Sequence, residues 1–134
     1  VLHRGVRPIP GEEYVFVATV PADDGIDIVG AARFVRSASN VRDACDICEF
    51  AITVAEAWRG SGLATELLRS LIRRARHDGY QVIEGFVLAE NRPMLALARH
   101  LHFEVAPQPD DGTTLRVWRS LQPKRRVSAR RTAR

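Results

Sequence analysis

Cysteine is nearly absent from this chain of 134 residues, and Cys45 and Cys48 are too few for a disulfide framework. A structural zinc site would need two further ligands, and the chain has no second cysteine pair. In a strand the two thiols would also point to opposite faces. We therefore expect no bound metal and interpret both cysteines as packing residues.

Long apolar runs are also missing. The longest, at 14–20 and 50–55, are far shorter than the roughly 20 residues of a membrane-spanning helix. No apolar stretch followed by small residues stands near the N-terminus, so no secretory signal is predicted. With 46% hydrophobic and 27% charged residues, the composition is typical of a soluble globular protein, and the length suits one domain. We expect a cytoplasmic protein without membrane contact.

The chain contains a single lysine, Lys124, and its other basic residues are arginines. The net charge of +4 comes from the C-terminal end of the sequence. Residues 119–134 contain seven basic and no acidic side chains, which leaves thirteen basic against sixteen acidic residues in the remainder. The body of the chain is therefore mildly acidic, and its charge does not predict a nucleic-acid-binding face. We expect a single domain over residues 1–121 and a disordered basic tail over 122–134.

Alternating and apolar patterns predict six strands. Residues 14–20 and 26–35 flank a turn-like Pro-Ala-Asp-Asp-Gly stretch and predict an antiparallel hairpin. Residues 46–54 predict a strand whose later part is apolar on both faces and hence buried. Further strands are expected at 81–88, 103–105 and 113–118.

Helical periodicity is strongest over residues 62–77, where apolar side chains recur every three or four positions and arginines lie mostly opposite. Gly79 suits the left-handed residue that ends such a helix. A second helix is predicted to begin at Asn91, a good N-cap, with Pro93 in its first turn. Strand, helix and strand in this order imply a right-handed parallel crossover and an α/β fold with a mixed sheet.

The segment Trp58-Arg59-Gly60-Ser61-Gly62-Leu63-Ala64-Thr65 joins the strand 46–54 to the first helix. A glycine-containing turn at a helix N-terminus presents unpaired N–H groups and the positive end of the helix dipole, which suits a pyrophosphate. It lacks the Lys-Ser/Thr ending of a nucleotide P-loop and the spacing of a dinucleotide fingerprint. On its own the pattern is equally typical of a tight turn that needs small residues.

The run Arg59-Gly60-Ser61-Gly62-Leu63-Ala64 matches the Arg/Gln-x-x-Gly-x-Gly/Ala signature of the GNAT superfamily of N-acetyltransferases. The segment from Glu90 to Phe103 resembles that family's Asn-led helix, which ends in Gly-Phe. The two motifs lie within residues 59–103, about a third of the chain. Within the family, Glu49 to Val54 followed by this second helix is most similar to the acetyltransferase domain of bacterial protein-lysine acetyltransferases.

The resemblance implies an enzyme that moves the acetyl group of acetyl-CoA to an amine, either a protein lysine or a small molecule. It implies a cofactor cleft where the strands 46–54 and 81–88 separate. The implied cofactor-binding residues are Ile52, Thr53 and Val54 on the first strand, Arg59, Gly60, Ser61, Gly62, Leu63, Ala64 and Thr65 in the loop and helix start, and Asn91. For Asn91, a plain helix cap is an equally good interpretation.

Amine attack on a thioester needs a base that removes a proton, and a partly buried carboxylate can serve. Glu49 is the candidate, because the resemblance places the catalytic glutamate of lysine acetyltransferase domains here. The alternative is an edge-facing or salt-bridged glutamate. Asp46 would point to the opposite face, and Glu84 is a weaker candidate.

The resemblance is incomplete in two places. Ala98 stands where many relatives carry a tyrosine that protonates the leaving thiolate, so no such acid is assigned. His102 replaces the glycine before Phe103; with His100 it suggests either a proton relay or two surface histidines, and we favour the latter.

Family members also open with a strand and two helices, which we expect to be missing here. The chain would then be part of a longer protein, or a homodimer partner would cover the sheet. Two other function classes stay open: a noncatalytic acetyl-CoA-binding module, and a nucleic-acid-associated protein led by its tail. The acceptor cannot be named from the sequence.

Overall fold

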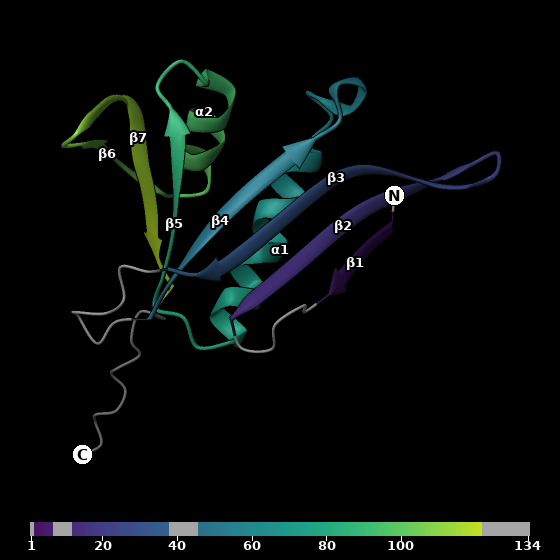
Figure 1. Ribbon diagram of the computed structural model, residues 1–134, viewed down its shortest axis with the longest axis horizontal. Coiled ribbons are helices and arrows are strands. Elements are labelled where there is room, and N and C mark those ends of the chain that lie inside the picture. The colour runs from purple at the N-terminus through teal and green to yellow at the C-terminus, as the bar shows by residue number, and fades with distance from the viewer. Residues whose placement is uncertain (1, 7–11, 38–45, 122–134) are drawn as a thin grey trace.

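The computed structural model describes residues 2–6, 12–37 and 46–121, and within these ranges one mixed sheet carries two helices on one face (Figure 1). The predicted tail 122–134 and Cys45 lie outside the described residues. In chain order the elements are β1 (Leu2–Val6), β2 (Glu13–Ala22), β3 (Gly25–Arg36), β4 (Ile47–Val54), the 3-10 turn η2 (Glu56–Trp58), α1 (Leu63–His77), β5 (Val82–Leu88), α2 (Arg92–His100), β6 (Glu104–Gln108) and β7 (Asp111–Ser120).

Seven strands form the sheet in the order β1-β2-β3-β4-β5-β7-β6. All neighbours are antiparallel except β4 and β5, which α1 connects as the predicted parallel crossover. The hairpin of β2 and β3 is present as predicted, and α1 ends at a left-handed Gly79 with φ of 90°. The predicted α/β fold with a mixed sheet is therefore confirmed.

The core lies between the sheet and the two helices. Alternate residues of the central strands, among them Phe34, Cys48 and Ile83, are fully buried against Leu67, Leu71 and other apolar residues of the helices. Figure 1 shows α1 crossing behind β2, β3 and β4. The other face carries no helix within the described residues, and Phe86 and Leu88 of β5 are exposed there.

Three expectations from the sequence are corrected. A strand does precede the hairpin: β1 pairs with β2, whereas the sequence predicted that the N-terminal strand is missing. The later part of β4 is not buried on both faces, because Ala51 and Thr53 are exposed on the face without helices. The two closing strands are longer than predicted, since β6 and β7 continue to a short turn at Pro109 and Asp110. Within the described residues no helical turn precedes η2.

The parallel pair β4 and β5 separates partway along its length. Three residue pairs are in register, the last being Glu49 with Glu84, although both strands continue beyond them. At this point the ring of Phe50 lies over Gly85 and meets Phe103 edge to face, with ring centroids 5.7 Å apart. The separated strands leave a wedge that opens toward the N-termini of both helices.

Glycine at position 85 is required by this packing. An added Cβ would lie 2.5 Å from the Phe50 ring, which core neighbours hold in place. We expect Gly85→Ala to lower the free energy of unfolding by about 1–3 kcal/mol, as overpacking does. Chemical denaturation of Gly85→Ala and of the pair Gly85→Ala/Phe50→Leu would test this. If Phe50 and Gly85 are in contact, the double variant should be more stable than the sum of the two single effects predicts. A free energy of unfolding that equals this sum would contradict the contact.

Candidate functional site

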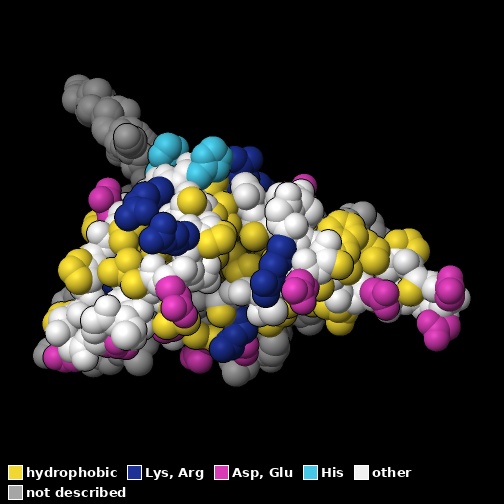
Figure 2. Space-filling view, turned by 90° about the horizontal axis from the view of Figure 1, so that it is seen from above, with side chains coloured by type: hydrophobic (Ala, Val, Ile, Leu, Met, Phe, Trp, Pro, Cys, Tyr) yellow, Lys and Arg dark blue, Asp and Glu magenta, His cyan; other side chains and the backbone are white. Residues whose placement is uncertain are grey.

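A cavity of about 980 Å³ lies in the wedge between β4 and β5 and continues to the N-termini of α1 and α2. Figure 2 looks onto this end of the molecule and shows a hollow with hydrophobic side chains in it. Ten of the eleven residues that the sequence predicted to bind a cofactor line it: Ile52, Thr53, Val54, Arg59, Gly60, Gly62, Leu63, Ala64, Thr65 and Asn91. Segments far apart in the sequence therefore meet at one cavity.

The backbone of β4 faces the wedge at Ile52 and Val54. Ser37 N–H donates to the carbonyl of Ile47, and Ala55 N–H donates to the carbonyl of Val29, so the odd-numbered residues point their backbone groups toward β3. Because these groups alternate along a strand, those of Ile52 and Val54 point toward β5. No register pair with β5 is formed there, so these groups are available to an extended ligand with amide groups.

The turn before α1 adopts the conformation that glycine permits. Gly60 and Gly62 have φ angles of 78° and 90°, in the left-handed region where L side chains are strained. Gly62 is the N-cap and supplies no side chain, so the N–H groups of Ala64 and Thr65 have no acceptor among the described residues. These donors and the helix dipole make the start of α1 a site for an anion.

Ser61 is the predicted residue that does not line the cavity. Its hydroxyl donates to the Trp58 carbonyl at 2.5 Å and accepts from the Leu63 N–H at 3.3 Å, so it stabilises the turn itself. Asn91 accepts from the Met94 N–H at 3.2 Å and caps α2, while it also lines the cavity. Its side-chain oxygen is thus a cap, and its amide N–H groups remain for a ligand.

Sequence reasoning missed six residues of the cavity wall: Trp58, Leu88, Glu90, Pro93, Met94 and Leu97. Met94 and Leu97 lie three positions apart on α2 and are only half-buried. Apolar residues at helical spacing are as typical of a core position as of a cavity wall, so the sequence pattern does not distinguish the two.

Glu49 occupies the last register pair before the strands separate. Its neighbours Cys48 and Phe50 point into the core, so strand alternation directs the half-buried Glu49 to the face without helices. It does not line the cavity, and it stands at the edge of the wedge, on the opposite side of the sheet from α1. A group that enters the wedge from the open face would pass this carboxylate.

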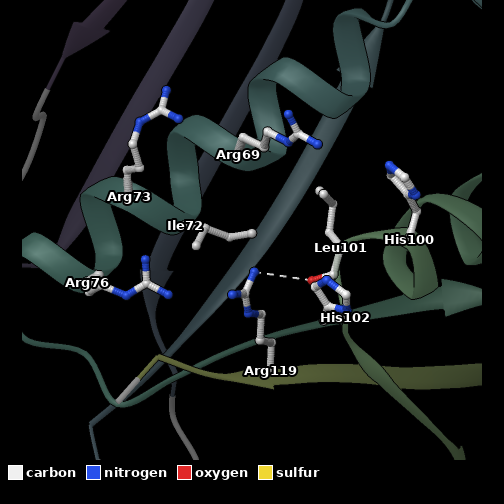
Figure 3. Close-up of a pocket in the computed structure, with 8 residues that line it drawn as sticks. All are labelled: Arg69, Ile72, Arg73, Arg76, His100, Leu101, His102 and Arg119. Carbon is white, nitrogen blue, oxygen red and sulfur yellow. Dashed lines mark hydrogen bonds between the residues drawn. The ribbon is translucent and has the colours of Figure 1, made fainter. Parts of the chain in front are cut away.

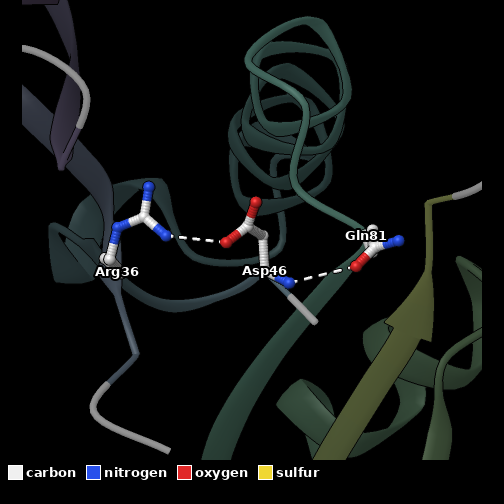
Figure 4. A network of polar contacts seen from close by, with 3 residues as sticks. All are labelled: Arg36, Asp46 and Gln81. Carbon is white, nitrogen blue, oxygen red and sulfur yellow. Dashed lines mark hydrogen bonds and ion pairs between the residues drawn. The ribbon is translucent and has the colours of Figure 1, made fainter. Parts of the chain in front are cut away.

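The other two carboxylates considered from the sequence have partners. Asp46 precedes β4, pairs with Arg36 at 2.8 Å, and donates its N–H to the Gln81 side chain at 3.1 Å (Figure 4). The hydrogen bond from Arg36 to Asp46 raises the pKa of the guanidinium. Glu84 is buried and accepts from Ser37 at 2.9 Å and from Arg116 at 2.8 Å. Neither is a free base in the wedge.

The remaining reactive side chains lie outside the cavity. Cys48 is fully buried in the core, and burial raises the pKa of its thiol, which disfavours the reactive thiolate. His100 and His102 are exposed and line a different hollow. Among the described residues no group of three or more His, Cys, Asp or Glu could hold a metal ion. No helix in residues 2–6, 12–37 and 46–121 has the length and apolarity needed to cross a membrane.

Comparison with known proteins gives the same family as the motifs. A model of the acetyltransferase (GNAT) family matches residues 7–103. Acetyltransferase PA5475 of Pseudomonas aeruginosa is 33% identical over 102 residues, which make up 76% of this chain and 52% of that protein. The L-methionine sulfoximine/L-methionine sulfone acetyltransferase of the same species is 35% identical over 74 residues, or 54% of this chain and 43% of that protein. This chain spans about half the length of these relatives.

Solved structures share the fold. The GNAT domain of S. lividans PAT has a TM-score of 0.70 at 22% identity, with 81% of this chain and 61% of that one covered. The structure of yncA from Salmonella typhimurium with its cofactor acetyl-CoA has a TM-score of 0.65 at 26% identity, with 82% and 65% covered. Because the family model covers well over half of the sequence and its two motifs meet at one cavity, the chain belongs to the acetyltransferase (GNAT) family.

Proposed function

We propose that this chain binds acetyl-CoA in the wedge between β4 and β5 and transfers the acetyl group to a primary amine. The observation that carries the proposal is the meeting of unpaired β4 backbone and unpaired α1 N–H groups in one cavity. The unpaired backbone groups of β4 can form hydrogen bonds with the amides of a pantetheine arm. The unpaired N–H groups of α1 can bind a pyrophosphate. The backbone of Ile52 and Val54 would hold the arm, and the turn from Gly60 to Thr65 would hold the pyrophosphate.

The chemistry is acyl transfer by direct attack. The amine nitrogen forms a bond to the thioester carbonyl carbon, the carbon–sulfur bond breaks, and one proton leaves the nitrogen. Glu49 takes that proton, directly or through water, from an amine that approaches across the open face of the sheet. Ala98 has no group that could protonate the departing thiolate, so the thiolate takes its proton from water.

The acceptor is a primary amine of one of two kinds. The relative that acetylates L-methionine sulfoximine and L-methionine sulfone supports the amine of a small amino-acid analogue. Similarity in fold to the S. lividans PAT domain, together with the motif around Glu49, supports a protein lysine. A noncatalytic acetyl-CoA-binding module is the second candidate, because no helix among the described residues covers the open face where an acceptor would be held.

An acceptor screen tests the transfer. The chain would be incubated with acetyl-CoA and either L-methionine sulfoximine or a lysine-containing peptide, and release of free CoA thiol would be followed with a thiol reagent. We expect one acceptor class to raise thiol release well above the rate without acceptor. Binding of acetyl-CoA without transfer to either class would favour the noncatalytic module.

A further inference from the structure

A second hollow, of about 350 Å³, lies between the middle and end of α1 and the turn that leads from α2 into β6 (Figure 3). Its polar lining consists of four arginines and two histidines: Arg69, Arg73, Arg76, Arg119, His100 and His102. Among the described residues no carboxylate lines it. We call it the basic pocket. Its residues come from three places in the sequence, so it exists only in the folded chain.

The arginines of the basic pocket differ from four other arginines of the chain. Arg33, Arg36, Arg74 and Arg116 are each paired with a carboxylate at 2.8–3.2 Å. In the part of the chain that the structure describes, no carboxylate pairs with any of the four in the basic pocket. Four guanidiniums without a paired carboxylate give this hollow a positive local potential.

Neutral acceptors hold three of these guanidiniums in place. Arg119 donates to the Leu101 carbonyl at 3.2 Å, which Figure 3 shows as a dashed line, and Arg76 donates to the Leu121 carbonyl at 3.2 Å. Arg73 donates to the Ser70 hydroxyl at 3.3 Å. Such bonds orient a guanidinium and leave its charge intact, and each guanidinium carries five N–H donors, so most remain for a ligand.

Arg119 is the least exposed of the four arginines, and burial, and next the repulsion from Arg76, lower its pKa. An anion beside Arg119 would offset this cost of holding it charged. The planar fork of arginine matches phosphate oxygens, and the pocket is concave and small rather than an extended basic stripe. A small phosphate compound therefore fits better than a nucleic-acid backbone.

We propose that the basic pocket binds a phosphate group of a small ligand. Arg69 lies one helical turn after Thr65 on α1, and Leu101 lies one turn after Leu97 on α2, so the basic pocket follows the cofactor cavity along the same two helices. The phosphate therefore has two sources: the 3′-phosphate of CoA, which rests on the proposed function, or a separate phosphate compound.

Calorimetric titrations of the whole chain at low salt distinguish the sources, with Arg76→Gln as the test variant and Arg99→Gln as its control. Both residues are exposed helical arginines, and Arg99 does not line the basic pocket. In the first arm CoA and dephospho-CoA are titrated. A CoA source predicts that the wild type prefers CoA by about tenfold and that Arg76→Gln, but not Arg99→Gln, abolishes the preference.

The second arm uses inorganic pyrophosphate in a Gly62→Glu background, which removes the anion site at the start of α1. A separate source predicts binding that Arg76→Gln weakens about tenfold and Arg99→Gln leaves unchanged. If Arg76→Gln and Arg99→Gln behave alike in both arms, the proposal is overturned. Arg69→Gln, at a position without a hydrogen bond to lose among the described residues, replaces Arg76→Gln if that variant melts abnormally. If only the proposed function is wrong, neither CoA nor dephospho-CoA binds in the first arm. Pyrophosphate still binds to the basic pocket in the second arm.

Discussion

Glu49→Gln is expected to lower the turnover number for acetyl transfer by about 10²–10⁴-fold, the usual contribution of a general base. Affinity for acetyl-CoA should stay within about twofold, because Glu49 does not line the cofactor cavity. Glutamine keeps the shape and hydrogen-bonding capacity of the side chain, so the loss would report the missing proton acceptor. Steady-state kinetics with the best acceptor, together with an acetyl-CoA titration, measure both quantities.

Glu104→Gln is the matched control, since Glu104 is exposed on β6, three strands away from β4 in the sheet, and does not line the cavity. It should leave turnover unchanged. Retention of wild-type turnover by Glu49→Gln would remove this residue from the mechanism. An equal loss in both variants would mean that the effect is one of net charge.

Gly62→Glu is expected to weaken acetyl-CoA binding by about 100-fold or more. The new carboxylate would stand at the anion site, and two like charges about 5 Å apart repel by roughly 3 kcal/mol at an effective dielectric constant of about 20. The left-handed backbone at Gly62 would add strain of about 1–2 kcal/mol. No atom lies within 4 Å of an added Cβ, so the chain should still fold. A calorimetric titration and a thermal melt measure binding and folding.

Gly62→Ala separates strain from charge. Alanine meets the same φ of 90° and adds no charge, so its loss of affinity should be much smaller than that of glutamate. Equal losses in the two variants would show that backbone conformation, not repulsion of the pyrophosphate, governs the site. Unchanged affinity in Gly62→Glu would place the pyrophosphate elsewhere.

Local pattern predicted the elements that carry the site. The apolar period of α1, the left-handed Gly79 and the N-cap Asn91 all lie in contiguous sequence, and each is present as expected. Ten of the residues predicted from the motif resemblance to bind a cofactor line one cavity. That they meet follows from the crossover between β4 and β5, which the strand and helix order already implied.

Features that a short local pattern does not encode were not predicted. β1 is a strand of five residues, and a pattern of that length carries little signal. Thr53 was expected in a buried strand, but only one face of β4 is covered among the described residues.

The basic pocket was missed for a similar reason. Arg69, Arg73 and Arg76 have the spacing of a solvated helix face, and the pocket forms only where β7 brings Arg119 beside them.

Every step proposed for this chain requires that it holds acetyl-CoA in the wedge between β4 and β5. Calorimetric titration of the purified chain with acetyl-CoA, with Gly62→Glu alongside, measures this binding directly. We expect saturable one-to-one binding to the wild type, and we expect the variant to lose it while still melting cooperatively. A wild-type chain that melts cooperatively and does not bind acetyl-CoA would show that the wedge is not a cofactor site.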